Sequence, residues 1–89
     1  MKRNKIYAWT LLDLVQEHGV CAGMDLLHLK TAYRGRNGEF SNVDQFHLDL
    51  LVNGGFLFLI AGAGAEPTKI QITWAGYDLL ESLHKELNE

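Results

Sequence analysis

The chain reads FHLDLLVNGGFL from Phe46 to Leu57 and IQITWAG from Ile70 to Gly76. The first run places apolar side chains at helical spacing and ends in a glycine pair, which is typical of a helix that stops before a strand. The second run alternates polar and apolar residues and then reaches a threonine, whose hydroxyl can cap another helix. The stretch therefore predicts a helix, a β-hairpin and a final helix, in that order.

The first of these helices is predicted to run from Ser41 to Asn53. Ser41 can cap the first turn with its hydroxyl, and Asp44 can reach back as the partner in a capping box. The apolar stripe consists of Val43, Phe46, Leu50 and Leu51. A glycine pair at Gly54 and Gly55 then ends the helix.

The hairpin combines an apolar strand, Phe56 to Ile60, with an alternating return strand, Lys69 to Ile72. Alternation in the first strand would bury only one set of its side chains. We therefore expect its other side either to meet a partner subunit, as in a homodimer, or to be covered by the chain's own helices. After the return strand, Thr73 is expected to cap the final helix, Gly76 to permit close packing, and Trp74 to seal the core between hairpin and helix.

The N-terminal part of the chain predicts two further helices. Apolar residues along Lys5 to His18, including Trp9, indicate a first helix that Gly19 ends. Met24 to Tyr33 fits either a helix or a strand, and we favour a short helix. Arg34 to Gly38 is predicted to be a loop because it is rich in glycine and asparagine.

Three helices, a β-hairpin wing and a C-terminal helix are the order of a winged helix-turn-helix fold. We expect one such domain over residues 1–89, of the α+β class and mainly helical. The composition, 47% hydrophobic and 21% charged, is that of a globular protein. The longest apolar run, Phe56 to Ala65, has about half the roughly 20 residues of a membrane span. Asp13 and Glu17 interrupt any signal-peptide pattern, and the single cysteine, Cys21, excludes an internal disulfide, so we expect a cytoplasmic protein.

The run from Phe46 to Leu57 resembles the His-Leu-x-x-Leu-x-x-x-Gly-Leu ending of many winged-helix recognition helices. Ile72 to Gly76 resembles the Leu-Thr-x-x-Gly start of their last helix. Together with the opening Met1-Lys2-Arg3, the chain is similar to a phage and prophage family, domain of unknown function 2513. The family pattern has histidine at the position of Tyr77 and phenylalanine at that of Leu79, and a basic-aromatic tail that this chain lacks. The resemblance implies a winged-helix shape and a phage setting.

DNA binding would use the exposed face of the Ser41–Asn53 helix, which could enter the major groove. The polar candidates on this face are Ser41, Asn42, Gln45, Asp49 and Asn53. The helix contains no Lys or Arg, although phosphate neutralisation supplies most of the non-specific affinity for DNA. A basic cluster could compensate, formed by Lys30, Arg34 and Arg36 with Tyr33 among them and assisted by Lys2, Arg3 and Lys5. The alternative is that these are ordinary solvated charges.

Charge also favours a second hypothesis, in which the protein docks onto another protein. Residues 1–36 hold six basic and three acidic side chains, whereas residues 37–89 hold two basic and eight acidic ones, so the second part carries a charge of −6. An acidic surface can pair with a basic groove of a host or phage protein. We therefore expect a binding protein, for example an inhibitor of a host defence complex of the anti-CRISPR kind, with a DNA-binding transcriptional regulator as the alternative.

Catalysis is the hypothesis that the residues favour least. The four histidines do not show a metal-ligand spacing with each other or with Cys21. His47 is expected at the polar rim of its helix, bonded to backbone. We expect no enzyme activity, no metal and no cofactor.

Overall fold

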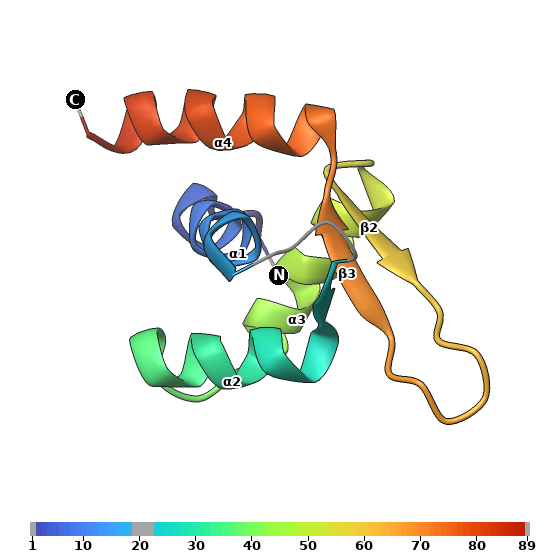
Figure 1. Cartoon of the computed structure of the whole chain (residues 1–89). Helices are drawn as coiled ribbons and strands as arrows, with labels where there is room; N and C mark the ends of the chain where they lie inside the picture. The colour runs from blue at the N-terminus through green and yellow to red at the C-terminus, as the bar shows by residue number, and fades with distance from the viewer. Residues whose placement is uncertain (1, 19–22, 89) are drawn as a thin grey trace.

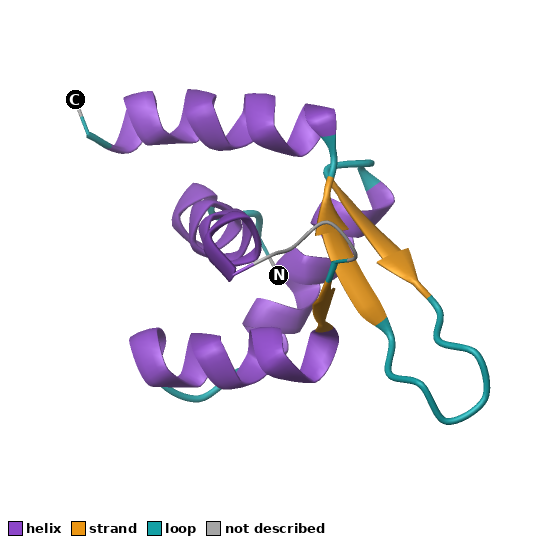
Figure 2. Ribbon diagram, in the orientation of Figure 1, coloured by secondary structure: helices purple, strands orange, loops and turns teal. Residues whose placement is uncertain are grey.

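The computed structural model describes residues 2–18 and 23–88, which form four helices and three short strands. In chain order these are α1 (Lys5–His18), β1 (Met24–Asp25), α2 (Leu26–Asn37), α3 (Asn42–Asn53), β2 (Leu57–Ile60), β3 (Lys69–Ile72) and α4 (Trp74–Leu87). The fold is α+β and mainly helical, which confirms the predicted class (Figures 1 and 2). Of the described helices, none is both long and apolar enough to cross a membrane.

Helix α1 is the central element of the core. It packs against α2, α3, α4 and β3, and Figure 1 shows it between α2 on one side and α4 on the other. The most deeply buried apolar side chains are Leu11, Leu12, Leu14, Val15, Leu29, Leu57 and Ile70. Trp9 is half-buried and packs against this cluster. Phe46 is also half-buried, with its ring 5.2 Å from the His47 ring in an edge-on contact.

The strands form one antiparallel sheet in the order β1-β3-β2. β2 and β3 are the predicted hairpin, with Leu59 opposite Ile70, and Met24 of β1 pairs with Ile70 from the other side. Leu57 and Ile70 are buried on the inner face, whereas Phe58, whose side chain points to the opposite face, is 58% exposed. β2 is therefore not covered on both faces by the chain's own helices.

The region between α1 and α3 differs from the prediction in two ways. The favoured helix exists, but it begins at Leu26, after the two-residue strand β1. The loop predicted from Arg34 to Gly38 is wrong, because α2 continues through Asn37. One glycine inside a helix costs only about 1 kcal/mol, so Gly35 is tolerated. The helix ends at Gly38, whose φ of 91° suits glycine and whose N–H donates to the Arg34 carbonyl at 3.2 Å. The expected end of α1 at Gly19, and Cys21, lie outside the described residues.

The junction between the hairpin and α4 has two of its three predicted features. The Thr73 hydroxyl accepts the Gly76 N–H at 3.0 Å, which confirms the predicted cap. Gly76 is buried, and a Cβ there would overlap the Phe56 carbonyl oxygen, which confirms the close packing. The role predicted for Trp74 is wrong, because this side chain is 85% exposed. Gly76 and the hairpin close this end of the core instead.

Candidate interaction site

Helix α3 begins with the predicted capping arrangement, and a buried tyrosine extends it. The Asp44 carboxylate accepts hydrogen bonds from the Ser41 N–H and the Ser41 hydroxyl, both at 2.8 Å. It also accepts a short hydrogen bond from the Tyr33 hydroxyl of α2. Burial alone would raise the pKa of Asp44, but these hydrogen bonds and the nearby His47 hold it below its usual value. The network therefore links α2 to α3.

Tyr33 consequently lies in the interior instead of among the surface cations. Its side chain is 5% exposed. Burial, together with the hydrogen bond to Asp44 and the negative charge of that carboxylate, raises the pKa of its hydroxyl. The hydroxyl has its partner inside the protein, and the residue stabilises the α2–α3 junction.

The three cations predicted to form a patch do not act together. Arg36 pairs with Asp13 of α1 at 2.8 Å and stands over the Trp9 ring at 5.4 Å. Lys30 lies 5.5 Å from the centre of the Phe40 ring. Arg34 is exposed and forms no ion pair within the part of the chain that the structure describes. Only Lys30 and Arg34, one helical turn apart on α2, therefore share a face.

The polar candidates on α3 lie at the surface, as predicted. Ser41, Asn42 and Asp49 are exposed, and Gln45 is half-buried. The Gln45 amide donates to the Asp49 carboxylate at 2.9 Å, so one potential reader of bases is already occupied within its own helix. This face presents amide and hydroxyl groups with one negative charge and no cation.

His47 lies deeper than expected, although its predicted backbone bonding is confirmed. The side chain is 1% exposed. Its Nδ1 lies 2.7 Å from the Val43 carbonyl, and its Nε2 accepts the Asn4 N–H at 2.8 Å. The Tyr7 ring stacks on it at 4.9 Å. The prediction of a rim position was wrong because helical spacing does not reveal that the segment before α1 covers this side chain.

The outer face of α4 carries a group of residues that were not predicted from the sequence to form a surface. Trp74 is 85% exposed and Tyr77 is 46% exposed. Asp78 and Glu81 are exposed and form no ion pair with any described residue. The four positions are i, i+3, i+4 and i+7, so they share one face of the helix. We call these four residues the α4 face; α4 is the outermost helix on its side of α1 (Figure 1).

One signal in the sequence could have indicated the α4 face. Gly76 permits α4 to pack closely against the hairpin. In a helix, the side chain two positions earlier, here Trp74, points about 160° away from the position of Gly76. A core position at Gly76 thus directs Trp74 outward. The apolar stripe of Leu79, Leu80 and Leu83 lies on the Gly76 side as well.

No group of three or more His, Cys, Asp or Glu side chains in residues 2–18 and 23–88 is arranged to hold a metal ion. No protein-family model, curated protein or solved structure matches this chain.

Proposed function

We propose that this protein is a non-catalytic binding protein of the winged-helix type that docks onto a basic surface of another protein through the α4 face. The carrying observation is the 85% exposure of Trp74 beside two carboxylates without ion-pair partners among the described residues. The partner in this proposal is a host or phage protein, and occlusion of its basic groove would make the chain an inhibitor.

The order and pairing of the elements support the winged-helix part of the proposal. A two-residue strand precedes α2, a hairpin follows α3, and β1 pairs with β3. A helix-turn-helix followed by a β-hairpin wing has this order. In that scheme α2 and α3 form the helix-turn-helix, and the loop between β2 and β3 is the wing tip (Figure 2).

Exposure of Trp74 supports docking energetically. A tryptophan buries about 200 Å² when it is covered, which contributes roughly 4 kcal/mol before the costs of association. Trp and Tyr are the residues most enriched among those that dominate interface energies, with Arg their frequent companion. Trp74 and Tyr77 are thus suitable anchors.

Charge defines the partner's side of the interface. Asp78 and Glu81 flank the two aromatic rings and would require cations opposite them. An arginine satisfies both features, because its guanidinium stacks on an aromatic face and binds a carboxylate in a bidentate manner. Basic grooves that normally hold nucleic acid present such arginines.

The test is a photo-crosslinking capture with a benzophenone amino acid placed at position 77. We expect one dominant crosslinked protein, its yield falling at least tenfold in Trp74→Ala and in the double variant Asp78→Asn with Glu81→Gln. Added salt should reduce the yield as well. The matched control is Leu27→Ala on α2, which removes a side chain of similar exposure, 74%, far along the chain. An unchanged yield in Trp74→Ala, or an equal loss in Leu27→Ala, refutes the proposal.

A DNA-binding transcriptional regulator is the second candidate, favoured by the exposed amide group of Asn42 and the half-buried one of Gln45 on α3, together with Arg34, which is exposed and has no ion-pair partner among the described residues. Amide side chains can bind adenine edges in the major groove. In a mobility-shift assay on mixed duplex DNA, Arg34→Ala should then weaken binding and reduce its salt dependence, while Arg36→Ala, whose charge is already paired, should change it less. The absence of any shift at low salt would exclude this candidate.

A further inference from the structure

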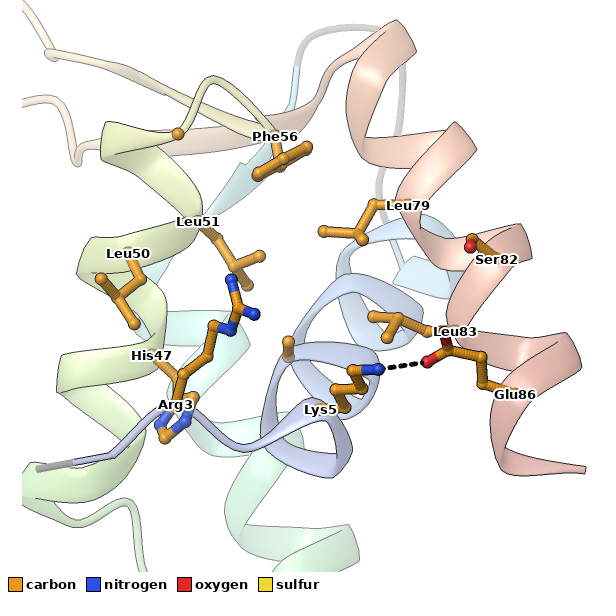
Figure 3. A pocket seen from close by; sticks show the side chains of 12 residues that line it. Arg3, Lys5, His47, Leu50, Leu51, Phe56, Leu79, Ser82, Leu83 and Glu86 are labelled. Carbon is orange, nitrogen blue, oxygen red and sulfur yellow. Dashed lines mark hydrogen bonds and ion pairs between the residues drawn. The ribbon is translucent and has the colours of Figure 1, made fainter.

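A cleft of about 370 Å³ lies between α3 and α4, with the first turns of α1 beside it (Figure 3). Its apolar lining consists of Ala8, Leu50, Leu51, Phe56, Leu79 and Leu83. The volume is within the range of about 300–1,000 Å³ found for small-molecule sites. The cleft therefore has the size and lining of a site for an apolar group.

A cation accompanies these apolar walls. Arg3 precedes α1 and lines the cleft, and Figure 3 shows its guanidinium directed into the space between α3 and α4. It forms no ion pair with any residue in the described ranges. The second cation at the cleft, Lys5, is already neutralised by Glu86 at 2.8 Å. Of the described charges that line the cleft, that of Arg3 is thus the one without an ion-pair partner, and its complement is a single anionic group.

The same ion pair limits what can enter. Lys5 belongs to α1 and Glu86 to α4, so their contact bridges the two helices along one side of the cleft (Figure 3). A helical peptide is about 10–12 Å across with its side chains and needs an open groove. A single alkyl chain can enter beside the bridge without breaking it.

We propose that this cleft binds a single-chain amphipathic carboxylate of the medium-chain fatty-acid class. The alkyl chain lies among Leu51, Leu79 and Leu83, and the carboxylate pairs with the Arg3 guanidinium through charge-assisted hydrogen bonds. This site uses the side of α4 that faces α3, so this proposal does not depend on the docking function proposed for the α4 face.

The test is calorimetric titration of the whole chain with three probes of equal length, namely decanoate, decanol and decylamine, below their micelle concentrations. We expect decanoate to bind at one saturable site about tenfold more tightly than decanol, and decylamine to bind most weakly. Arg3→Met replaces the cation by an unbranched apolar side chain and should abolish the preference for decanoate over decanol. Lys2→Met is the matched control, since Lys2 is an exposed neighbouring cation that does not line the cleft.

A second variant distinguishes binding in the cleft from non-specific hydrophobic binding elsewhere on the protein. Ser82 is exposed and lines the cleft from α4, so Ser82→Phe should narrow the cleft without disturbing the core. We expect this variant to weaken the binding of both decanoate and decanol at least fivefold. Circular dichroism establishes that each variant is folded. Equal affinity for decanoate and decanol, a preference retained in Arg3→Met, unchanged binding in Ser82→Phe, or no saturable binding each overturns the proposal.

Discussion

Replacement of Gly76 by alanine should destabilise the protein, although alanine is the better helix former. An added Cβ would overlap the Phe56 carbonyl oxygen and lie 2.7 Å from Ile72 Cγ1. That carbonyl cannot easily move away, because it accepts the Thr73 N–H at 3.1 Å and the Thr73 hydroxyl at 3.0 Å. Relief of the overlap therefore requires α4 to shift relative to the hairpin.

The magnitude follows from two opposing terms. Exchange of glycine for alanine inside a helix contributes up to about 1 kcal/mol. Overpacking in a close-packed region costs about 1–3 kcal/mol, and a collision with backbone lies at the upper end of that range. We expect a net loss of about 2 kcal/mol in the free energy of unfolding, which lowers the Tm of a domain of this size by about 8–16 °C.

Gly35 provides the matched control, because it also lies inside a helix but a Cβ there meets nothing within 4 Å. Gly35→Ala should therefore raise the free energy of unfolding by about 0.5–1 kcal/mol. Both variants are compared with the parent chain by thermal and urea denaturation followed by circular dichroism. A Gly76→Ala variant as stable as the parent would refute the packing argument, and a Gly35→Ala variant that loses stability would contradict the extension of α2 through this residue.

Three further predictions concern single side chains. Tyr33→Phe removes a donor from the buried Asp44 carboxylate and should lower the free energy of unfolding by about 1.5–3 kcal/mol at neutral pH. The folded-state pKa of Asp44 lies below its ordinary 3.8, so the stabilisation from this hydrogen bond is complete above pH 3.8 and is lost as the pH falls through the folded-state pKa. The free energies of unfolding of the parent chain and of Tyr33→Phe, measured by urea denaturation, should therefore converge at low pH. A difference that persists there would contradict the prediction. Thr73→Ala should cost about 1 kcal/mol by urea denaturation, whereas Thr73→Ser, which keeps the capping hydroxyl, should cost clearly less; equal losses would count against the cap. Trp74→Ala should change stability by less than about 0.5 kcal/mol in the same assay, while Trp9→Ala should cost several times more, and the reverse order would restore the core role first predicted for Trp74.

Signals confined to a few neighbouring residues predicted the local structure well. Ser41 and Asp44 indicated the start of α3, and Gly54 and Gly55 its end. Thr73 likewise indicated the start of α4. Caps depend on hydrogen bonds between residues three apart, so the sequence itself holds both partners.

Features that depend on distant residues could not be predicted in this way. Met24 becomes a strand only because Ile70 offers an unpaired edge of β3. His47 is buried because Asn4, far away in the sequence, donates to its ring. Arg36 of α2 pairs with Asp13 of α1 and therefore does not form a patch with Arg34. The fold class was therefore accessible from sequence, whereas the partners of the charged side chains, and with them the proposed binding surface, were not.

The fixed junction at Thr73 has a consequence for the thermodynamics of docking. Thr73 is held on both sides, by the Phe56 carbonyl at 3.1 Å and by the Gly76 N–H at 3.0 Å. Trp74 is the next residue, so its backbone is ordered before any partner arrives. At this residue the ordering cost of association is then limited to the rotamer freedom of the exposed ring, and no loop needs to be ordered. The proposed anchor is thus pre-organised, and its complexes should lose little affinity to conformational entropy.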